Sequence, residues 1–573
     1  MGNLAPEEVI GEELLAICKD ENRKDVFKNL KAFFERGAIC NEAYLTEALF
    51  ILKIRLFPDE VLDLLITKGA NRRIKNAFNH RRGYYAFAEE HKGFYRGKCS
   101  VWRARDRVIM KRILKELGNP QDKIPPVLHI TGSNGKGSVC GFLGGILEAQ
   151  GYKVHKFQTP ALINTNEMIT LAGEVISDEK LILLTRKVIK TYFKIKDDPK
   201  LIAEIKKADE LDASRGKVYT DPVYENMLYW CIQVPVMFLA FASVPADFSI
   251  IEVIVGGKND FTNVIKPKNT LATVLTHIEY GIGSNDGTMP KYHNDGTVEN
   301  STVAACYHKA NLGKPGIPMI AADQEPDGLA EIRRVARDEV KTETFEFNRD
   351  WFIKNETKND FTLSIFNKEI KIQKSKTLIG DFQTKNIATA ASTLLFLREA
   401  GKIKLDLSLI NDGIQKTEIP ARPQRVYNSF LNKFLGSDVE ILAGVIKLNS
   451  RGVQPFEEVL EENNDYTNYF IYTASGRVQK HGTGALAFIE KYFNDASRLV
   501  LYEYKEFYRG SIEKVREILN EENIKFTYKN SLSSALTFVK NEIKNAKTKA
   551  RVILCCESMI NMDKKIYYFS QSN

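Results

Sequence analysis

The residues best suited to chemistry lie between Thr131 and Ser138, in the stretch HITGSNGKGSV. An apolar run ending at Ile130 predicts a strand before them, and a helix is expected to open near Gly137. Glycines let backbone N–H groups approach phosphate oxygens, a lysine adds positive charge near the β- and γ-phosphates, and a serine hydroxyl can bind Mg²⁺. The spacing departs from the full Walker motif, because Ile130 stands where the first glycine would be.

The succession of strand, Gly-rich loop (residues 131–138) and helix predicts a binding site for nucleotide phosphates. The residues expected to contact the nucleotide here are Gly132, Ser133, Asn134, Gly135, Lys136, Gly137 and Ser138.

Glu252 is a second residue suited to chemistry, because it sits in the apolar run SIIEVIV. A carboxylate is costly to bury unless it meets a metal or a partner. A metal site and a buried ion pair are both open interpretations at this point.

The elements that position these residues follow from the apolar pattern. From residue 101 onward, short apolar runs alternate with helical stretches, which predicts an α/β fold with a parallel sheet. Residues 1–100 show helical periodicity instead, and a second α/β block follows the turn-rich segment 417–424. We therefore expect a helical N-terminal extension (1–100), a central ATP-binding domain (101–415) and a smaller C-terminal α/β domain (416–573). The helices of the extension are expected at 7–19, 23–37 and 41–57.

Composition limits the classes of protein that fit. The 573-residue chain is 43% hydrophobic and 27% charged, which excludes collagen-like and largely disordered chains. A net charge of +9 favours anionic small molecules without requiring nucleic acid. The eight cysteines are scattered without a CxxC pair, so we expect no disulfide framework and a cytoplasmic location. The acidic N-terminus lacks the basic flank and apolar run of a signal peptide.

Two stretches raise the question of other partners. Residues 228–246 approach the length of a membrane-spanning helix, but Gln233 and Pro235 interrupt them, so we expect a buried core helix and no membrane partner. Basic and aromatic residues interleave from Arg72 to Phe87, which suits either nucleic acid or a solvated helix face. We expect the solvated face.

The Gly-rich loop resembles the TGTNGKGS loop of the folylpolyglutamate and dihydrofolate synthases, within the Mur-type ATP-dependent amide ligases, and differs from it only at Ser133. Further segments resemble that family in the same order along the chain. They are LGNPQ (117–121), FQTPALINTNEMITLAGEVIS (157–177), VYENML (223–228), IIEVIVGGKNDFTNVI (250–265), HKANLGKPGIP (308–318) and GDFQTKNIATAA (380–391). The resemblance implies a Mur-ligase-type P-loop ATPase domain with a parallel sheet, followed by a Rossmann-like C-terminal domain.

The resemblance also implies ATP and Mg²⁺ as cofactors. Ser138, Thr159 and Glu252 would then hold the magnesium ion. Lys309 aligns with the lysine that the family carbamylates to hold a second metal, and a surface lysine on a helix is the alternative.

Further residues are assigned to the nucleotide by the same resemblance. Gln383 and Asn386, one helical turn apart, resemble residues that contact the adenine and phosphate region. Arg425 in RPQRV resembles the arginine of the family's PGR sequence, which reaches ATP phosphates from the second domain. Thr262 and Asn263, after Asp260, resemble a loop that helps to shape the pterin site.

The sequence departs from the family pattern in its metal and C-terminal motifs. The DH pair expected after 269–278 is missing, so His293 in KYHND is the candidate metal ligand, and a solvated histidine is the alternative. In the C-terminal block, Ala443 and Ile446 replace the Asp and His of DGAHNP. Met168 replaces the arginine of the family's ERI.

We expect an ATP-dependent ligase that adds L-glutamate to a folate through an acyl phosphate, because an amine joins a carboxylate in water only after activation. Lys136, Lys309 and Arg425 are the expected catalytic residues. A Mur-type ligase with another amino acid or acceptor is one alternative. A degenerate nucleotide-binding protein without ligase activity is the other. We expect a monomer.

Overall fold

The computed structural model describes most of residues 104–556, together with parts of the first 68 residues. The gaps within 104–556 are 160, 162–164, 215–228, 280–290, 293–297, 300, 420–421, 428, 446–449, 463–464, 474–483, 504–511 and 547–548.

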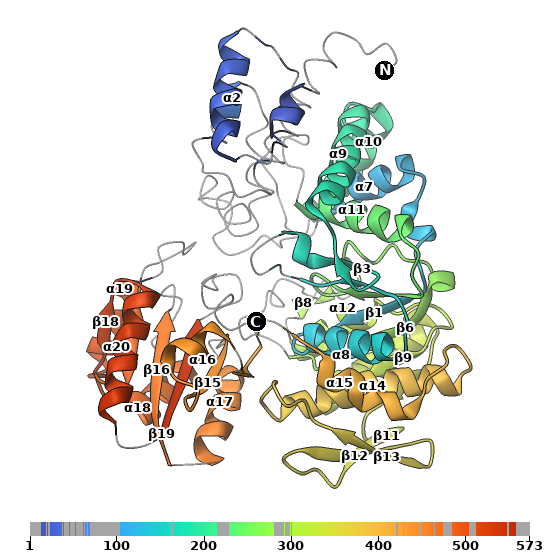
Figure 1. The fold of residues 1–573 in the computed structure, drawn as a ribbon. Helices are drawn as coiled ribbons and strands as arrows, with labels where there is room; N and C mark the ends of the chain where they lie inside the picture. Colours follow the sequence, from blue (N-terminus) through green and yellow to red (C-terminus); the bar gives the residue numbers. More distant parts are fainter. Residues whose placement is uncertain are drawn as a thin grey trace.

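An eight-stranded sheet forms the centre of the molecule (Figure 1). Its strands run parallel from β10 to β2, whereas β3 and β4 continue one edge in antiparallel pairing. In spatial order the strands are β10 (Thr344–Glu346), β9 (Met319–Ala321), β6 (Thr270–Leu275), β1 (Val127–Thr131), β5 (Phe248–Glu252), β2 (Val154–Phe157), β3 (Ile169–Leu171) and β4 (Glu174–Val175). The predicted parallel α/β sheet is therefore confirmed, with an antiparallel edge that the sequence pattern did not predict.

The strand order fixes where the site lies. β1 pairs with β5 on one side and with β6 on the other, both in parallel. Because parallel strands end at the same edge of a sheet, the Gly-rich loop, Glu252 and the segment after Leu275 meet there.

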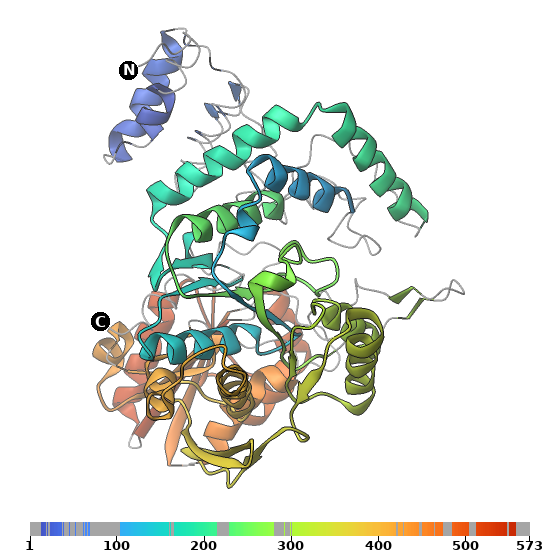
Figure 2. The ribbon, with the colours of Figure 1, turned by 90° about the vertical axis from the view of Figure 1, so that its right-hand side faces the viewer.

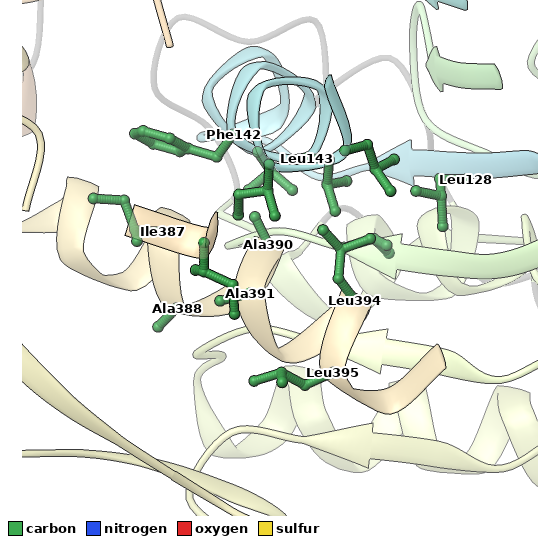
Figure 3. Close-up of a cluster of buried hydrophobic side chains, with 14 of the residues drawn as sticks. Leu128, Phe142, Leu143, Ile387, Ala388, Ala390, Ala391, Leu394 and Leu395 are labelled. Atoms are coloured by element: carbon green, nitrogen blue, oxygen red, sulfur yellow. The ribbon is translucent and has the colours of Figure 1, made fainter. Parts of the chain in front are cut away.

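Helices cover both faces of this sheet, as Figure 2 shows from the side. Side chains alternate along β1, so that Leu128 and Ile130 face one hydrophobic core and Val127 faces the other. The first core lies between the sheet, α8 (Lys136–Ala149), α14 (Phe382–Glu399) and α15 (Ile410–Lys416), and Figure 3 shows the packing of Leu143 near Ala390. The second core is formed with α7 (Ala104–Glu116), α9 (Asp178–Ile195), α10 (Pro199–Ser214) and α11 (Tyr229–Ser243).

Smaller elements complete the central unit. Next to β9 and β10 lie α12 (Thr302–Ala310), α13 (Pro326–Arg334) and a π-helical turn (Val335–Val340). A separate antiparallel sheet contains β11 (Trp351–Lys354), β12 (Asp360–Ile365) and β13 (Lys368–Gln373). The turn between β12 and β13 places Phe366 and Asn367 at positive φ, as a two-residue hairpin turn requires.

The C-terminal residues form a second sheet beside the central unit (Figure 1). All its strands are parallel except β14, and apolar side chains alternate between two cores. In spatial order the strands are β14 (Gln424–Val426), β15 (Glu440–Val445), β19 (Lys549–Cys556), β16 (Tyr466–Thr473), β17 (Leu499–Tyr502) and β18 (Thr527–Lys529). The helices are α16 (Phe430–Leu435), α17 (Ser450–Glu462), α18 (Gly484–Phe493), α19 (Ile512–Glu521) and α20 (Leu532–Asn545).

Direct contacts join the two units. Lys358 after β11 forms an ion pair of 2.7 Å with Glu462 of α17. The backbone N–H of Asp381, which precedes α14, donates to the Glu458 carboxylate at 3.1 Å. The second sheet is therefore anchored beside the first turns of α14.

The N-terminal extension is described only in part. Helix α2 (Arg23–Glu35) confirms the helix expected at 23–37, and its Val26, Leu30 and Phe33 are buried in a small apolar core. The basic and aromatic run from Arg72 to Phe87 lies outside the described residues.

The apolar stretch after residue 228 forms α11, a buried helix that contains Pro235, as the sequence predicted. Within the part of the chain that is described, no helix has the length and apolar character needed to cross a membrane. The cysteines that the structure describes form no disulfide with one another.

Close packing of α15 against α8 yields a test of the fold. A Cβ at Gly413 would lie 2.6 Å from the Gly145 carbonyl oxygen, which is backbone and cannot rotate away. We expect Gly413→Ala to push the two helices apart and to lower the free energy of unfolding by about 3 kcal/mol, measured by urea denaturation. The exposed neighbour Lys416→Ala is the control and should leave stability within about 0.5 kcal/mol. Equal stability of both variants would contradict the packing.

Candidate active site

The Gly-rich loop leaves the carboxyl end of β1 and leads into α8. Gly132 has φ +148° and Gly135 has φ +85°, which residues with a Cβ rarely adopt. A Cβ at Gly132 would overlap the Thr276 side chain, and one at Gly135 would overlap the Asn386 amide. Glycine is therefore required at both positions for the loop to bend and for its neighbours to approach.

The segment after β6 holds the loop in place. The N–H groups of Ser133 and Asn134 both donate to the His277 carbonyl, at 3.0 and 3.1 Å. The Thr276 hydroxyl donates to the Asn134 carbonyl at 2.5 Å. Glu279, which sequence reasoning did not single out, accepts from the Asn134 side-chain amide at 3.1 Å. Ser133 and Asn134 thus help to fix the loop, and the nucleotide contacts expected of them stay a prediction.

Two lysine side chains meet at one carbonyl oxygen of the loop. Lys136 Nζ donates to the Gly132 oxygen at 2.9 Å, and Lys309 Nζ donates to the same oxygen at 3.2 Å. Lys309 lies near the end of α12 and is only 2% exposed. Lys309 is therefore a buried residue and not the surface lysine that was the alternative expectation. Gly257 packs beneath it, because a Cβ there would lie 2.8 Å from the Lys309 carbonyl oxygen.

Glu252 lies at the end of β5, beside the loop, and is 3% exposed. Its carboxylate accepts the backbone N–H of Thr159 at 3.1 Å. Burial raises the pKa of Glu252, while nearby Lys136 and Arg422 oppose that shift. Glu252 is therefore both a member of a buried charged group and an oxygen donor beside the loop.

The oxygen atoms of Ser138 and Glu252 lie beside the loop, where they could bind a magnesium ion. The Ser138 hydroxyl is buried at the start of α8, and Glu252 Oε2 would lie 3.8 Å from a Cβ placed on Gly137. Hydroxyl and carboxylate oxygens are ligands that Mg²⁺ prefers, usually together with phosphate and water. Among the described residues, no three His, Cys, Asp or Glu side chains gather to bind a metal by themselves. His293 lies outside the described residues.

The structure places Arg422, and not Arg425, next to the loop. A Cβ at Gly137 would overlap the Arg422 guanidinium, and Arg422 interacts electrostatically with Glu252. Arg425 instead pairs with Glu440 of β15 and lies 3.7 Å from Glu462. The two arginines are three residues apart, and Pro420 two residues before Arg422 reproduces the Pro-X-Arg spacing. That spacing is the signal that could have identified Arg422.

Gln383 and Asn386 lie in the first turns of α14, on one face, as predicted. The Asn386 side-chain amide donates to the Gln383 side-chain oxygen at 2.9 Å, and both residues are buried. Since Asn386 also packs against Gly135, this pair closes one side of the loop.

The described part of the altered C-terminal motif lies in β15, which contacts the segment that follows Arg422. Ala443 of β15 pairs in register with Gln424 of β14. A Cβ at Gly444 would lie 2.9 Å from the Pro423 backbone, so β15 packs directly against the residue after Arg422. Ile446 lies outside the described residues.

Comparison with known proteins gives sequence relatives for part of the chain. No protein-family model matches it. It is 31% identical to the dihydrofolate synthase/folylpolyglutamate synthase of Bacillus subtilis over 228 residues, 40% of this chain and 44% of that protein. It is 25% identical to the folylpolyglutamate synthase of Lacticaseibacillus casei over 327 residues, 55% of this chain and 65% of that protein. The matched regions therefore span less than two thirds of either relative.

Solved structures extend the similarity to most of the chain. The folylpolyglutamate synthase of Mycobacterium tuberculosis, in complex with ADP and AMPPCP, matches with a TM-score of 0.60 at 17% identity. The match covers 82% of this chain and 96% of that one. At this identity the likeness establishes the shared α/β fold.

The two arginines can be told apart by substitution. We expect Arg422→Met to weaken binding of the ATP analogue AMPPCP by about tenfold or more, because a charge-assisted contact contributes about 1.5–3 kcal/mol. Arg425→Met should leave that affinity near the wild-type value but reduce stability, since Glu440 loses one of its two arginine partners and keeps only Arg551. Calorimetric titration and thermal unfolding measure the two effects. Weaker AMPPCP binding in Arg425→Met, with near wild-type affinity in Arg422→Met, would instead assign the nucleotide contact to Arg425.

Proposed function

Because the chain is a distant homologue of the folylpolyglutamate and dihydrofolate synthases of the Mur ligase superfamily, we propose that it is an ATP-dependent ligase that adds L-glutamate to a folate. The observation that carries this proposal is the convergence of Lys136, Lys309 and Glu252 on the Gly-rich loop. Such a group of charges suits phosphoryl transfer, which depends on positioning and charge neutralisation.

In this proposal the ATP phosphates bind along the loop. Lys136 contributes positive charge from one side and Arg422 from the other, next to Gly137. Gln383 and Asn386 border the loop at Gly135 and would contact the nucleotide there. The amide groups at the start of α8 add the positive end of a helix dipole.

Magnesium fits the oxygen donors beside the loop. Ser138, Glu252 and Thr159 would hold the ion, together with oxygen atoms of the phosphates and of water. His293 completes the proposed ligand set. A bound Mg²⁺ neutralises the charge that develops on the transferred phosphoryl group.

The reaction balances in two steps. The acceptor carboxylate takes the γ-phosphoryl group of ATP, which gives an acyl phosphate and ADP. The amine of the incoming amino acid then attacks the acyl carbon, so that an amide forms, phosphate leaves and a proton is released. Closure of the C-terminal unit over the loop would exclude water from the acyl phosphate.

Lys309 has the shielded position that a carbamylated lysine needs. Carbamylation requires a neutral amine, and removal from water disfavours the charged form. We propose that Lys309 carries this modification and contributes an oxygen ligand beside Gly132.

Two alternatives follow from specific residues. Ala443 stands where the family has an aspartate, which favours a ligase with another amino acid or acceptor. The same change is compatible with a degenerate protein that binds nucleotide without turnover.

Release of ADP separates these functions. With ATP, Mg²⁺ and a reduced folate present, we expect ADP release to rise at least tenfold when L-glutamate is added, as followed by a coupled spectrophotometric assay. The control omits the folate. Tight ATP binding with no dependence on any amino acid would favour the degenerate protein. Dependence on a different amino acid would favour the other ligase.

Substitution of Lys309 tests the proposed modification. Lys309→Ala should reduce glutamate-dependent turnover by about 100-fold or more, because a charge-stabilising contact is lost from the transition state. Added acetate or another short carboxylate should restore part of that turnover by supplying the missing oxygen ligand. Intact-mass and carbon-13 NMR measurements in labelled bicarbonate would detect the carbamate itself. Full activity of Lys309→Ala would contradict the role.

A further inference from the structure

A cavity of about 600 Å³ lies beside β10, the edge strand of the central sheet. Its wall comes from the end of α13, the π-helical turn that follows and the segment that leads into β10. This volume is within the range of small-molecule pockets, roughly 300–1,000 Å³. We call it the edge cavity. Among the described residues, its charged lining consists of four cations and one acid, which are Arg333, Arg337, Lys341, Arg349 and Glu343.

The edge cavity is separate from the nucleotide loop. Thr344, which lines the cavity, begins β10, whereas the Gly-rich loop follows the carboxyl end of β1. Because the strands from β10 to β1 are parallel, these two points lie at opposite ends of the sheet. β9 and β6 also separate β10 from β1, which adds about 14 Å across the sheet. A ligand in the edge cavity would therefore be distinct from the nucleotide at the loop.

A buried carboxylate fixes two of the guanidinium groups. Glu346 is 1% exposed, and both of its oxygens accept from Arg333 Nε at 3.0 Å. Arg349 Nη1 donates to the same carboxylate at 2.9 Å. Glu346 itself does not line the cavity. The two arginines are thus held in place before a ligand arrives, which reduces the entropy lost on binding.

Cationic donor groups remain beside the cavity after these ion pairs have formed. Arg337 binds Asp338 through Nε and Nη2, at 2.7 and 2.9 Å. Within the described part of the chain, neither Arg333 nor Arg337 uses its Nη1 in a hydrogen bond, and Lys341 forms no ion pair. An anion in the cavity could therefore accept hydrogen bonds from all three side chains.

Lys341 has a backbone conformation that is unusual for a lysine. Its φ of 64° and ψ of 56° lie in the left-handed region, which glycine adopts without strain. It directly follows the π-helical turn, and such turns are frequent at functional sites. A lysine at this position costs stability relative to glycine, as expected of a residue whose side chain has a function.

A peptide strand does not fit this edge of the sheet. The Thr344 carbonyl accepts from Arg349 Nη2, and the Glu346 N–H donates to Asp350 Oδ2 at 2.7 Å. These side chains occupy backbone groups that an added strand would need. A small anion is therefore the occupant that suits the cavity.

We propose that the edge cavity binds a small molecule that carries a diphosphate group. Guanidinium groups match phosphate oxygens in a bidentate fork, and an ammonium group adds a point charge. Two linked phosphates offer enough oxygens to engage Arg333, Arg337 and Lys341 together. This inference does not rest on the proposed function.

Calorimetric titration of the full chain tests the site, with saturating AMPPCP and Mg²⁺ present to fill the nucleotide loop. The probes are pyrophosphate, inorganic phosphate and citrate. We expect pyrophosphate to bind at one site per chain, at least tenfold more tightly than phosphate or citrate. Lys341→Gly and Arg337→Gln should each weaken that binding by about tenfold or more, because each removes a charge-assisted contact. Glu343→Gln should strengthen it, because the acidic side chain of the lining repels an anion.

Three controls separate binding from folding. Lys341→Gly relieves the left-handed backbone, so its melting temperature should not fall below that of the wild type. Lys341→Arg keeps the charge and should retain the binding of pyrophosphate. Lys402→Gly removes an exposed charge after α14 and should retain the wild-type affinity.

Each outcome bears on one claim. Pyrophosphate binding that neither Lys341→Gly nor Arg337→Gln weakens would overturn the site. Equal affinity for pyrophosphate, phosphate and citrate would overturn the diphosphate assignment. Weaker binding in Lys341→Gly together with a lower melting temperature would attribute the loss to the fold and overturn the role of this lysine. Failure of AMPPCP to bind would count against the proposed function alone, because the cavity variants still report on the edge cavity.

Discussion

The carbonyl oxygen of Gly132 is the point on which the geometry of the candidate site depends. It accepts hydrogen bonds from both Lys136 and Lys309, and the second of these lysines is almost fully buried. A buried amine without an acceptor would be costly, so the bend of the loop helps to stabilise the buried Lys309 by offering it this carbonyl oxygen. Thr276 sets the bend, because it leaves no room for a Cβ at position 132.

The same arrangement connects the loop to the second sheet. Arg422 lies beside Gly137 and interacts electrostatically with Glu252, while the next residue, Pro423, packs against Gly444 of β15. The Pro423 carbonyl also accepts the Ile379 N–H at 3.0 Å, just before α14. A movement of β15 would therefore displace Pro423 and, through the adjacent Arg422, the Gly-rich loop.

The sequence predicts the features that depend on a local pattern of residues. It does not predict the features that depend on contacts between residues far apart in the chain. Apolar runs gave the main strands, and glycine spacing gave the loop. The roles of Ser133 and Asn134 depend on His277 and Glu279, more than 140 residues away in sequence, and no local signal joins them. The sequence could not separate Arg425 from Arg422 for another reason. Both arginines fit a loose motif, and only the partners Glu440 and Glu252 tell them apart.

The substitution at position 443 bears on which amino acid the protein could recognise. Ala443 is 1% exposed and packs in the apolar core formed with Val426 and Leu554. An aspartate at this position would bury a carboxylate among apolar side chains, which is costly without a partner. Position 443 therefore belongs to the apolar core of the second sheet, and the alanine side chain there cannot bind a polar substrate. In the proposed ligase, the amino acid would therefore contact residues other than Ala443, so its specificity need not follow that of the relatives.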